Sequence, residues 1–270
     1  MAEKQSTSPV TVATLQRMKS AGEKITCLTC YDASFTRVLE AAGVDMFIVG
    51  DSLGMVLKGH ETTVPVTMAD MLYHAANVAR VGRHALRVVD MPYMSYANPD
   101  QALGNAARLV AEGGADMVKL EGGQDKADIV RHLVGHDIPV CGHIGLLPQS
   151  IEELGGYHVQ GRDEDGARAL LADAQALEAA GATLLVMACI PAELAALITS
   201  SVNMPTIGIG AGPDCDGQVL VLYDMLGITP GKVPKFVRNF LQDTDSVPSA
   251  VKAYVDAVKD GSFPAPEHCF

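Results

Sequence analysis

The sequence predicts an α/β protein built as a single (β/α)8 barrel, a closed parallel sheet surrounded by helices. Eight short apolar runs recur along the 270-residue chain, and most are separated by segments with the apolar spacing of a helix. The runs are almost continuously apolar, which is typical of parallel strands buried on both faces. The turn after the first run reads YDASF, whereas an open doubly wound sheet normally carries G-x-G-x-x-G there. We therefore expect a barrel.

Each predicted strand is a short apolar run. The last run, QVLVLYDMLG, is also compatible with a helix. The eight runs cover residues 25–32, 45–52, 85–92, 116–123, 138–146, 182–191, 205–212 and 218–227.

The predicted helices between these strands end where a glycine can adopt the left-handed conformation. A helix over 11–19 should precede the first strand and close the floor of the barrel. Two amphipathic segments near the C-terminus, 235–241 and 250–261, are expected to form helices that pack outside the barrel or between subunits. The glycine-ended helices are 34–42 before Gly43, 99–112 before Gly113 and Gly114, and 165–180 before Gly181.

Composition is consistent with one continuous domain over residues 1–270, with a flexible N-terminus over residues 1–10. The chain is 48% hydrophobic and carries a net charge of −12 without a basic stripe, so nucleic acid and acidic membrane surfaces are excluded as expected partners. No run is long and apolar enough for a membrane span. We expect a cytoplasmic protein.

The six cysteines follow no disulfide framework. Cys27 and Cys30 form a C-x-x-C, but the flanking ITCLTC has the character of a strand, whereas a redox pair normally opens a helix. We expect buried thiols here and no redox or zinc site.

Three acidic residues stand at or just past the ends of predicted strands, namely Asp51, Asp90 and Glu121. The carboxyl ends of barrel strands meet at one face, so these carboxylates are candidate ligands for a hard cation such as Mg2+. The alternative is that each caps the following helix.

Further polar residues occur near the same strand ends. Lys119 and Glu121 share one face of a strand, where the lysine would either form a structural ion pair or meet a substrate anion. Ser52 could donate a hydrogen bond to an anion or cap a helix. His143 should lie at the barrel mouth or in a second layer beneath it.

Two glycine-rich segments allow both a functional and a structural interpretation. Gly208, Gly210 and Gly212 could cradle an anion with backbone N–H groups or permit a tight turn. Residues 154–166 suit a lid that excludes water, or a plain surface loop. Motifs of serine hydrolases, Walker A proteins and zinc proteases are absent from the sequence.

Several blocks carry a specific family resemblance, which runs from about residue 11 to the C-terminus. They are CYDASF, VGDSLGMVLKGHETTVPVT, DMPYMSY, MVKLEGG, VCGHIGLLPQS, GGYHVQGR, IGIGAG and DGSFPAPEH. Their order and identity resemble the 3-methyl-2-oxobutanoate hydroxymethyltransferase family, also called ketopantoate hydroxymethyltransferase.

The resemblance implies a barrel of the phosphoenolpyruvate/pyruvate group, usually a homodecamer, with one Mg2+ per subunit. Members transfer a hydroxymethyl group from the co-substrate 5,10-methylenetetrahydrofolate to 3-methyl-2-oxobutanoate through a Mg2+-stabilised enolate. The product is 2-dehydropantoate, an intermediate of pantothenate and coenzyme A biosynthesis. By motif, the metal ligands would be Asp51, Asp90 and Glu121, and the keto-acid contacts Asp51, Ser52, Asp90 and Lys119.

The chain departs from the family pattern at one position. Members carry a glutamate after the sixth strand that accepts the substrate proton, whereas LLVMACIP places Ala188 there. Glu193, in the next helix, is not expected to reach the mouth. We therefore expect an assembled site with strongly reduced turnover. Two alternatives remain: another Mg2+-dependent C–C lyase acting on 2-oxo acids in the same barrel group, or a catalytically silent homologue that binds keto acid.

Overall fold

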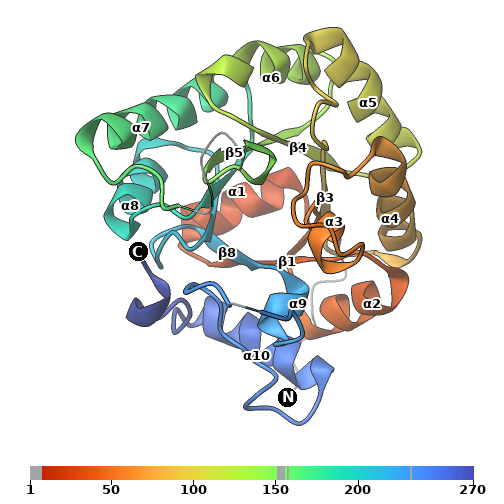
Figure 1. The fold of residues 1–270 in the computed structure, drawn as a ribbon, viewed down its shortest axis with the longest axis vertical. Coiled ribbons are helices and arrows are strands. Elements are labelled where there is room, and N and C mark those ends of the chain that lie inside the picture. Colours follow the sequence, from red (N-terminus) through yellow and green to blue (C-terminus); the bar gives the residue numbers. More distant parts are fainter. Residues whose placement is uncertain (1–7, 151–155, 157, 232) are drawn as a thin grey trace.

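A computed structural model describes residues 8–150, 156, 158–231 and 233–270 of the chain and contains a closed eight-stranded barrel (Figure 1). The strands pair in parallel in their order along the chain, and β8 returns to pair with β1. The predicted fold class is confirmed. The strands are β1 Ile25–Thr29, β2 Met46–Val49, β3 Leu86–Asp90, β4 Met117–Glu121, β5 Val140–Gly145, β6 Leu184–Ala188, β7 Thr206–Ile209 and β8 Gly217–Leu220.

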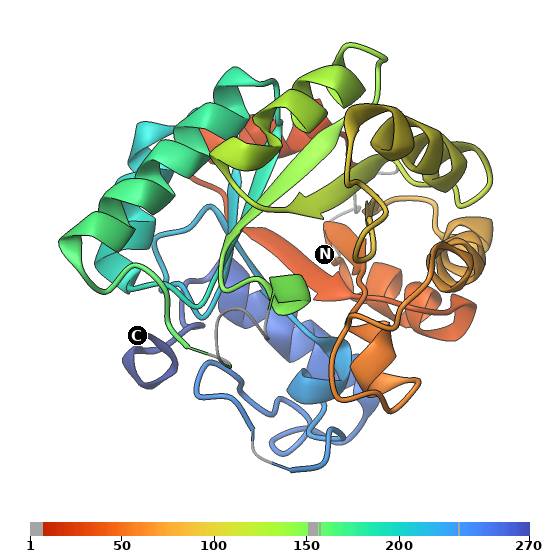
Figure 2. The same ribbon diagram turned by 45° about the horizontal axis from the view of Figure 1, so that its top comes forward.

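Helices surround the barrel in a ring, as Figure 2 shows. The eighth predicted run, 218–227, was compatible with a strand or a helix and contains both. Its first residues belong to β8, and the short helix α9 follows. The α-helices are α1 Val12–Ala21, α2 Ala33–Ala42, α3 Leu53–Val56, α4 Met68–Val81, α5 Pro99–Ala111, α6 Ala127–Val134, α7 Glu164–Ala179, α8 Ala192–Ser201, α9 Leu222–Met225 and α10 Val247–Lys259. Three 3-10 turns are η1 Gln124–Lys126, η2 Pro148–Ser150 and η3 Pro266–His268.

The predicted helix ends are confirmed at α2, α5 and α7. Gly43 ends α2 with a φ of 88°, and the chain leaves α5 and α7 through Gly114 and Gly181 with φ values of 70° and 102°. At the other end of α2, the Asp32 carboxylate accepts hydrogen bonds from Ser34 N and Phe35 N at 2.8 and 2.9 Å. These helix ends are therefore determined by local residues: a left-handed glycine at the C-terminal end and, for α2, a capping aspartate at the N-terminal end.

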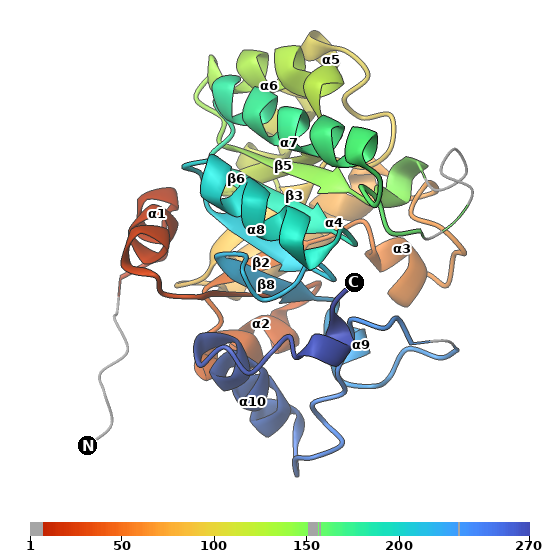
Figure 3. The ribbon, with the colours of Figure 1, turned by 90° about the vertical axis from the view of Figure 1, so that its left-hand side faces the viewer.

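Helix α1 closes the amino-terminal end of the barrel, as predicted. Its Leu15 and Met18 pack against the apolar side chains that fill the barrel interior, among them Ile25 and Met46. Figure 3 shows α1 at the end of the strands opposite α3 and α9. The carboxyl ends of the strands therefore face the open end of the cylinder.

The C-terminal region confirms one predicted helix and corrects the other. Helix α10 packs against α2 and β1, and the Tyr254 hydroxyl lies 2.8 Å from Cys27 O and 2.9 Å from Gln218 O. The helix expected over 235–241 is wrong, because this segment is a turn at 235–236, irregular backbone over 237–239 and a bend at 240–241. The Asn239 side chain accepts from the N–H groups of Leu241 and Gln242, which fixes a turn in place of helical hydrogen bonds.

The two thiols of the C-x-x-C lie in different apolar clusters. Cys27 lines the barrel interior, whereas Cys30 belongs to the layer between strands and helices, 3.3 Å from Thr36 Oγ1. Both are free thiols. Within the described part of the chain, no helix is long and apolar enough to cross a membrane.

Residues 1–7 of the predicted flexible N-terminus lie outside the described residues. Just after them, Val10 N donates to His84 O at 2.7 Å.

Candidate active site

Alternation along the strands delivers polar side chains to the open end of the barrel. Val88, Met117, Cys141 and Val186 belong to the cluster that fills the barrel interior. Side chains two residues further along each strand point to the same side. Those residues are Asp90 on β3, Lys119 on β4, His143 on β5 and Ala188 on β6.

Asp51, Asp90 and Glu121, here called the carboxylate cluster, are brought together by the fold. Each is buried, with 3–4% of its surface exposed. Asp51 N donates to Asp90 Oδ2 at 3.1 Å. Gln149 connects Asp51 to Glu121. Its side-chain Nε2 donates to Asp51 Oδ2 at 2.8 Å, and its backbone N donates to Glu121 Oε2 at 3.0 Å.

The alternative that these acidic residues cap the following helices is wrong. The elements that follow β2, β3 and β4 have Ser52, Asn98 and Gly123 at their N-cap positions. Asn98 supplies the cap of α5, since its side chain accepts from Gln101 N. The three carboxylates are therefore not used as helix caps.

Lys119 pairs with Asp90 inside the barrel, with Nζ 3.0 Å from Asp90 Oδ1. Burial opposes the charge of the lysine, but Asp90 and then Glu121 and Asp51 outweigh it, so the pKa of Lys119 is raised. Lys119 is therefore a buried ammonium whose direct carboxylate partner is Asp90.

The carboxylates carry pKa values above their usual range. Burial raises the pKa of Asp51, and the neighbouring charges of Asp90 and Glu121 raise it further. Burial also raises the pKa of Asp90 against the opposing effect of Lys119, and it raises that of Glu121 to about 7. Three buried carboxylates share one buried ammonium, so their full ionisation leaves an excess of negative charge.

This donor set fits a hard divalent cation in its chemistry. Buried carboxylate oxygens are ligands that Mg2+ accepts, and a dication would offset the excess negative charge. Among the described residues, however, no group of three His, Cys, Asp or Glu side chains is arranged closely enough to hold a metal as it stands. Gln149 engages one oxygen of Asp51 and one of Glu121.

Ser52 lies beside the cluster and is held by an aromatic hydroxyl. Its Oγ is 2.9 Å from the hydroxyl of Tyr31, a buried ring that stacks on Tyr223 at 5.9 Å between centroids. A Cβ on Gly50 would lie 2.8 Å from Ser52 Oγ and 3.5 Å from Asp90 Oδ2. Glycine at position 50 therefore leaves room for the side chains of Ser52 and Asp90 to lie close to the backbone.

His143 is a member of the site. Its Nδ1 lies 3.3 Å from Lys119 Nζ and 3.4 Å from Glu121 Oε1. Burial and then the positive charge of Lys119 lower the pKa of His143 well below its usual value. A neutral ring accepts from the ammonium at Nδ1 and so helps to hold Lys119 in place.

Ala188 closes β6 with an apolar side chain that is 6% exposed. It pairs in register with Gly145 and Ile209. Glu193 is exposed at the start of α8 and contributes no carboxylate to this region. The side chains clustered around Ala188, here called the apolar wall, are Leu146, Cys189, Ile209, Phe236 and Phe270.

The glycines after β7 serve tight packing. Gly210 and Gly212 have φ values of 60° and 79°. A Cβ on Gly210 would lie 2.8 Å from the Phe236 ring, and one on Gly212 would lie 2.5 Å from Ala192 Cβ. Because side chains fill the space beside this backbone, the structure favours the tight-turn interpretation over an anion cradle.

The predicted lid over 154–166 lies partly outside the described residues, which omit 154, 155 and 157. Within the described part, Gln160 N donates to Cys189 O at 3.0 Å, and Asp163 caps α7. Gln160 therefore lies beside Cys189 of the apolar wall. Closure of the segment over the site remains a prediction.

Two residues of the site were missed from the sequence. The Tyr96 hydroxyl donates to Gln149 Oε1 at 2.6 Å and accepts from Glu121 N at 3.3 Å. Both residues occur in loops that follow strands, within DMPYMSY and LLPQS. That position is the signal that could have identified them.

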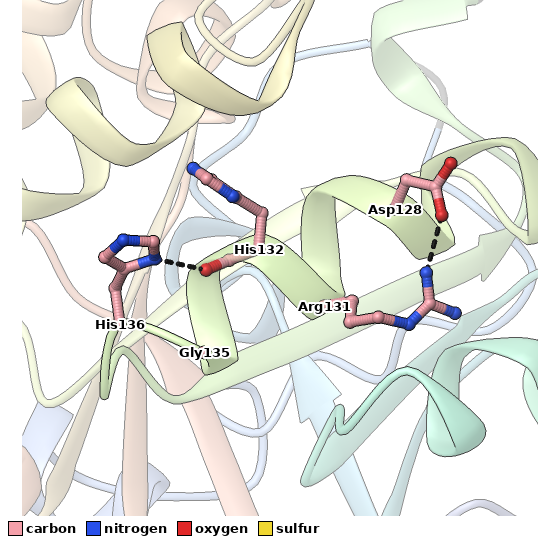
Figure 4. A pocket seen from close by; sticks show the side chains of 5 residues that line it. All are labelled: Asp128, Arg131, His132, Gly135 and His136. Carbon is pink, nitrogen blue, oxygen red and sulfur yellow. Dashed lines mark hydrogen bonds and ion pairs between the residues drawn. The ribbon is translucent and has the colours of Figure 1, made fainter.

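A surface cavity of about 290 Å³ lies on the outer face of α6 and the turn after it, away from the carboxylate cluster (Figure 4). Two of its polar groups are paired locally, because Arg131 bonds to Asp128 and His136 Nδ1 bonds to His132 O. The cavity shows no convergence of buried charge, and we assign it no chemistry.

Comparison with known proteins identifies relatives along nearly the whole chain. A family model described as ketopantoate hydroxymethyltransferase matches residues 9–266. A protein of Nitrosococcus oceani named 3-methyl-2-oxobutanoate hydroxymethyltransferase is 58% identical over 94% of this chain and 97% of its own length. One of the same name from Thiobacillus denitrificans is also 58% identical, over 97% of this chain and all of its own.

Solved structures with the same fold are more distant in sequence. A putative phosphonomutase from Burkholderia cenocepacia aligns with a TM-score of 0.62 and 18% identity, over 80% of this chain and 94% of its own. A phosphonopyruvate hydrolase solved in complex with oxalate and Mg2+ aligns with a TM-score of 0.60 and 11% identity, over 95% and 92%. These likenesses support the barrel architecture alone.

Proposed function

Because the chain belongs to the ketopantoate hydroxymethyltransferase family, whose reaction is a step of pantothenate biosynthesis, we propose how this chain takes part in that reaction. It binds 3-methyl-2-oxobutanoate together with one Mg2+ at the carboxylate cluster. The hydroxymethyl donor is 5,10-methylenetetrahydrofolate, and the product is 2-dehydropantoate. The proposal rests above all on the burial of three carboxylates with a single ammonium at the open end of the barrel.

Asp51, Asp90 and Glu121 are the residues that would hold the cation. A bound Mg2+ supplies Lewis-acid stabilisation for negative charge that develops on a keto oxygen. Hard oxygen donors and an excess of buried negative charge support this choice of ion. Gln149 links Asp51, through its side-chain amide, to Glu121, through its backbone N–H, without adding charge.

Lys119 and Ser52 would bind the anionic end of the substrate. The ammonium is charged at neutral pH and buried, so it would attract a carboxylate strongly in this low-dielectric setting. The Ser52 hydroxyl is oriented by Tyr31 and can donate a further hydrogen bond. His143 keeps Lys119 in place from the other side.

Removal of the C3 proton is the step for which this chain lacks the family's residue. The methyl group of Ala188 accepts no proton, and the apolar wall around it offers no carboxylate in its place. Loss of a positioned general base costs about 10²–10⁴-fold in rate. We therefore propose a chain that assembles the substrate site and turns over slowly.

Product analysis tests this proposal directly. Incubation with keto acid, Mg2+ and methylenetetrahydrofolate should yield 2-dehydropantoate slowly, and omission of the folate or the cation should abolish it. Product formation that is independent of folate would overturn the proposed donor. It would favour the C–C lyase alternative, which no contact in the site supports.

A catalytically silent homologue is the second candidate, and Ala188 is the observation that favours it. Calorimetry would then show Mg2+-dependent binding of the keto acid by the chain. Turnover would stay undetectable even after Ala188→Glu. Recovery of activity in that variant would exclude this candidate.

We extend the proposal to a homodecamer in the cytoplasm, which the family resemblance supports. Sedimentation velocity of the purified chain tests the assembly. A monomer or dimer at micromolar concentration would overturn it.

A further inference from the structure

Gln149 lies at the centre of the carboxylate cluster although it is supplied by a loop. It belongs to η2, after β5, and is 7% exposed. Its side-chain Nε2 donates to Asp51 Oδ2 at 2.8 Å and to Met91 O at 3.0 Å. Its backbone N donates to Glu121 Oε2 at 3.0 Å. One residue thus connects the ends of β2, β3 and β4.

The orientation of this amide is determined by its neighbours. A carboxylate oxygen and a backbone carbonyl surround Nε2, and both can only accept when the carboxylate is ionised. The Tyr96 hydroxyl donates to Oε1 at 2.6 Å and is itself held by Glu121 N. A glutamate of the same shape would place a carboxylate oxygen against two acceptors, Asp51 Oδ2 and Met91 O. The site therefore requires an amide at this position.

A neutral donor has an advantage at a cation site. The side-chain amide satisfies one oxygen of Asp51, the backbone N–H of the same residue satisfies one of Glu121, and together they keep the two carboxylates in a fixed relation. Because Gln149 carries no charge, it leaves the excess negative charge of the cluster uncompensated. A lysine in the same place could satisfy the same Asp51 oxygen, but its positive charge would compete with a divalent cation.

We propose that Gln149 is a positioning residue that pre-organises Asp51 and Glu121 for a divalent cation, with Tyr96 fixing its amide. This inference rests on the cation site of the proposed function. Partners of metal-ligating side chains typically contribute 10–100-fold to metal affinity. The effect of Gln149 should therefore appear in cation binding itself, before any substrate is present.

The experiment measures the affinity of the full chain for Mn2+, a spectroscopic substitute for Mg2+, in the absence of keto acid. Electron paramagnetic resonance of free Mn2+ gives the dissociation constant for the unmodified chain and for Gln149→Met. Gln218→Met is the matched control, because Gln218 is also a buried glutamine and its amide bonds to Gly212 O at 3.0 Å, outside the cluster. Thermal unfolding of each protein reports its stability separately.

We expect Gln149→Met to bind Mn2+ about 10–100-fold more weakly and the control to retain the affinity of the unmodified chain. Tyr96→Phe should weaken binding by a smaller factor, because it releases the Oε1 end of the amide and the Glu121 N–H but leaves both bonds from Gln149 to the carboxylates in place. It also decides the question if Gln149→Met does not fold.

Three results would overturn the inference, and they differ in what else they affect. Unchanged Mn2+ affinity in Gln149→Met, or in Tyr96→Phe if the first variant is unfolded, refutes the role of Gln149 and leaves the cation site standing. Failure of the unmodified chain to bind Mn2+ or Mg2+ refutes the cation site and the inference with it. A loss of affinity in the control equal to that in Gln149→Met would also refute a specific role.

Discussion

Replacement of Ala188 by glutamate is the change that tests the catalytic proposal most directly. The side chain would extend from the end of β6 into the open end of the barrel, between its register partners Gly145 and Ile209. It would supply a proton acceptor where the chain now has a methyl group. Exchange of the C3 proton of 3-methyl-2-oxobutanoate should then accelerate by about 10²–10⁴-fold.

The surroundings predict both the strength of the new base and its cost to stability. The apolar wall disfavours an ionised carboxylate and raises its pKa, which brings it closer to neutral pH and makes it a better base there. The longer side chain crowds a buried position, which typically costs about 1–3 kcal/mol. For a chain of this size, that corresponds to a fall in Tm of roughly 2–12 °C.

The assay is deuterium exchange, followed by proton NMR of the keto acid in heavy water with Mg2+ and without folate. Ala188→Gln is the control, because it has nearly the same shape and crowds the wall equally but accepts no proton at neutral pH. Equal exchange rates for the unmodified chain and Ala188→Glu would refute a missing base. Equal rates for the Glu and Gln variants would show that shape alone caused the change.

Four other predictions follow from the same groups. Formate should accelerate exchange in the unmodified chain but not in Ala188→Glu, since a small carboxylate can replace the missing one; no response in the unmodified chain contradicts this. Folding raises the pKa of the carboxylate cluster, so its protons stabilise the metal-free fold at low pH, and this stabilisation is lost as pH rises. The Tm of the metal-free protein should therefore fall between about pH 4.5 and about pH 7, the range of the Glu121 shift, while the increase in Tm on adding Mg2+ grows. Lys119→Ala should lower the free energy of unfolding by about 3–5 kcal/mol in urea titrations, and adding Asp90→Ala should restore part of it. Ellman's reagent should react first with Cys269, the one thiol that is not buried, and Cys269→Ser should abolish the fast phase.

Most of the fold could be predicted from the sequence because its determinants are local. Apolar runs of strand length identified seven strands and left the eighth run open between strand and helix, and glycines with left-handed backbone identified the ends of α2, α5 and α7. The segment over 235–241 was misjudged for the opposite reason. Its apolar residues suggest one helical face, but Phe240 packs individually against Tyr254 and Phe263, and Asn239 fixes a turn.

The candidate site was predictable where one strand end supplies one charged residue. Asp51, Asp90, Lys119 and Glu121 were identified in this way, and the fold brings them together. The hydrogen bonds that organise them were not predictable. A neutral glutamine in a loop has no pattern in the sequence, and its partners come from segments that meet only in the folded chain.

The hydroxyl of Tyr254 bridges the seam at which the first and last strands meet, since it reaches a carbonyl of each. A chain still emerging from the ribosome has all eight strands before it has this bridge. The bridge can therefore form only after synthesis has passed α10, so the seam gains these two hydrogen bonds later than the backbone pairing that closes the cylinder becomes possible.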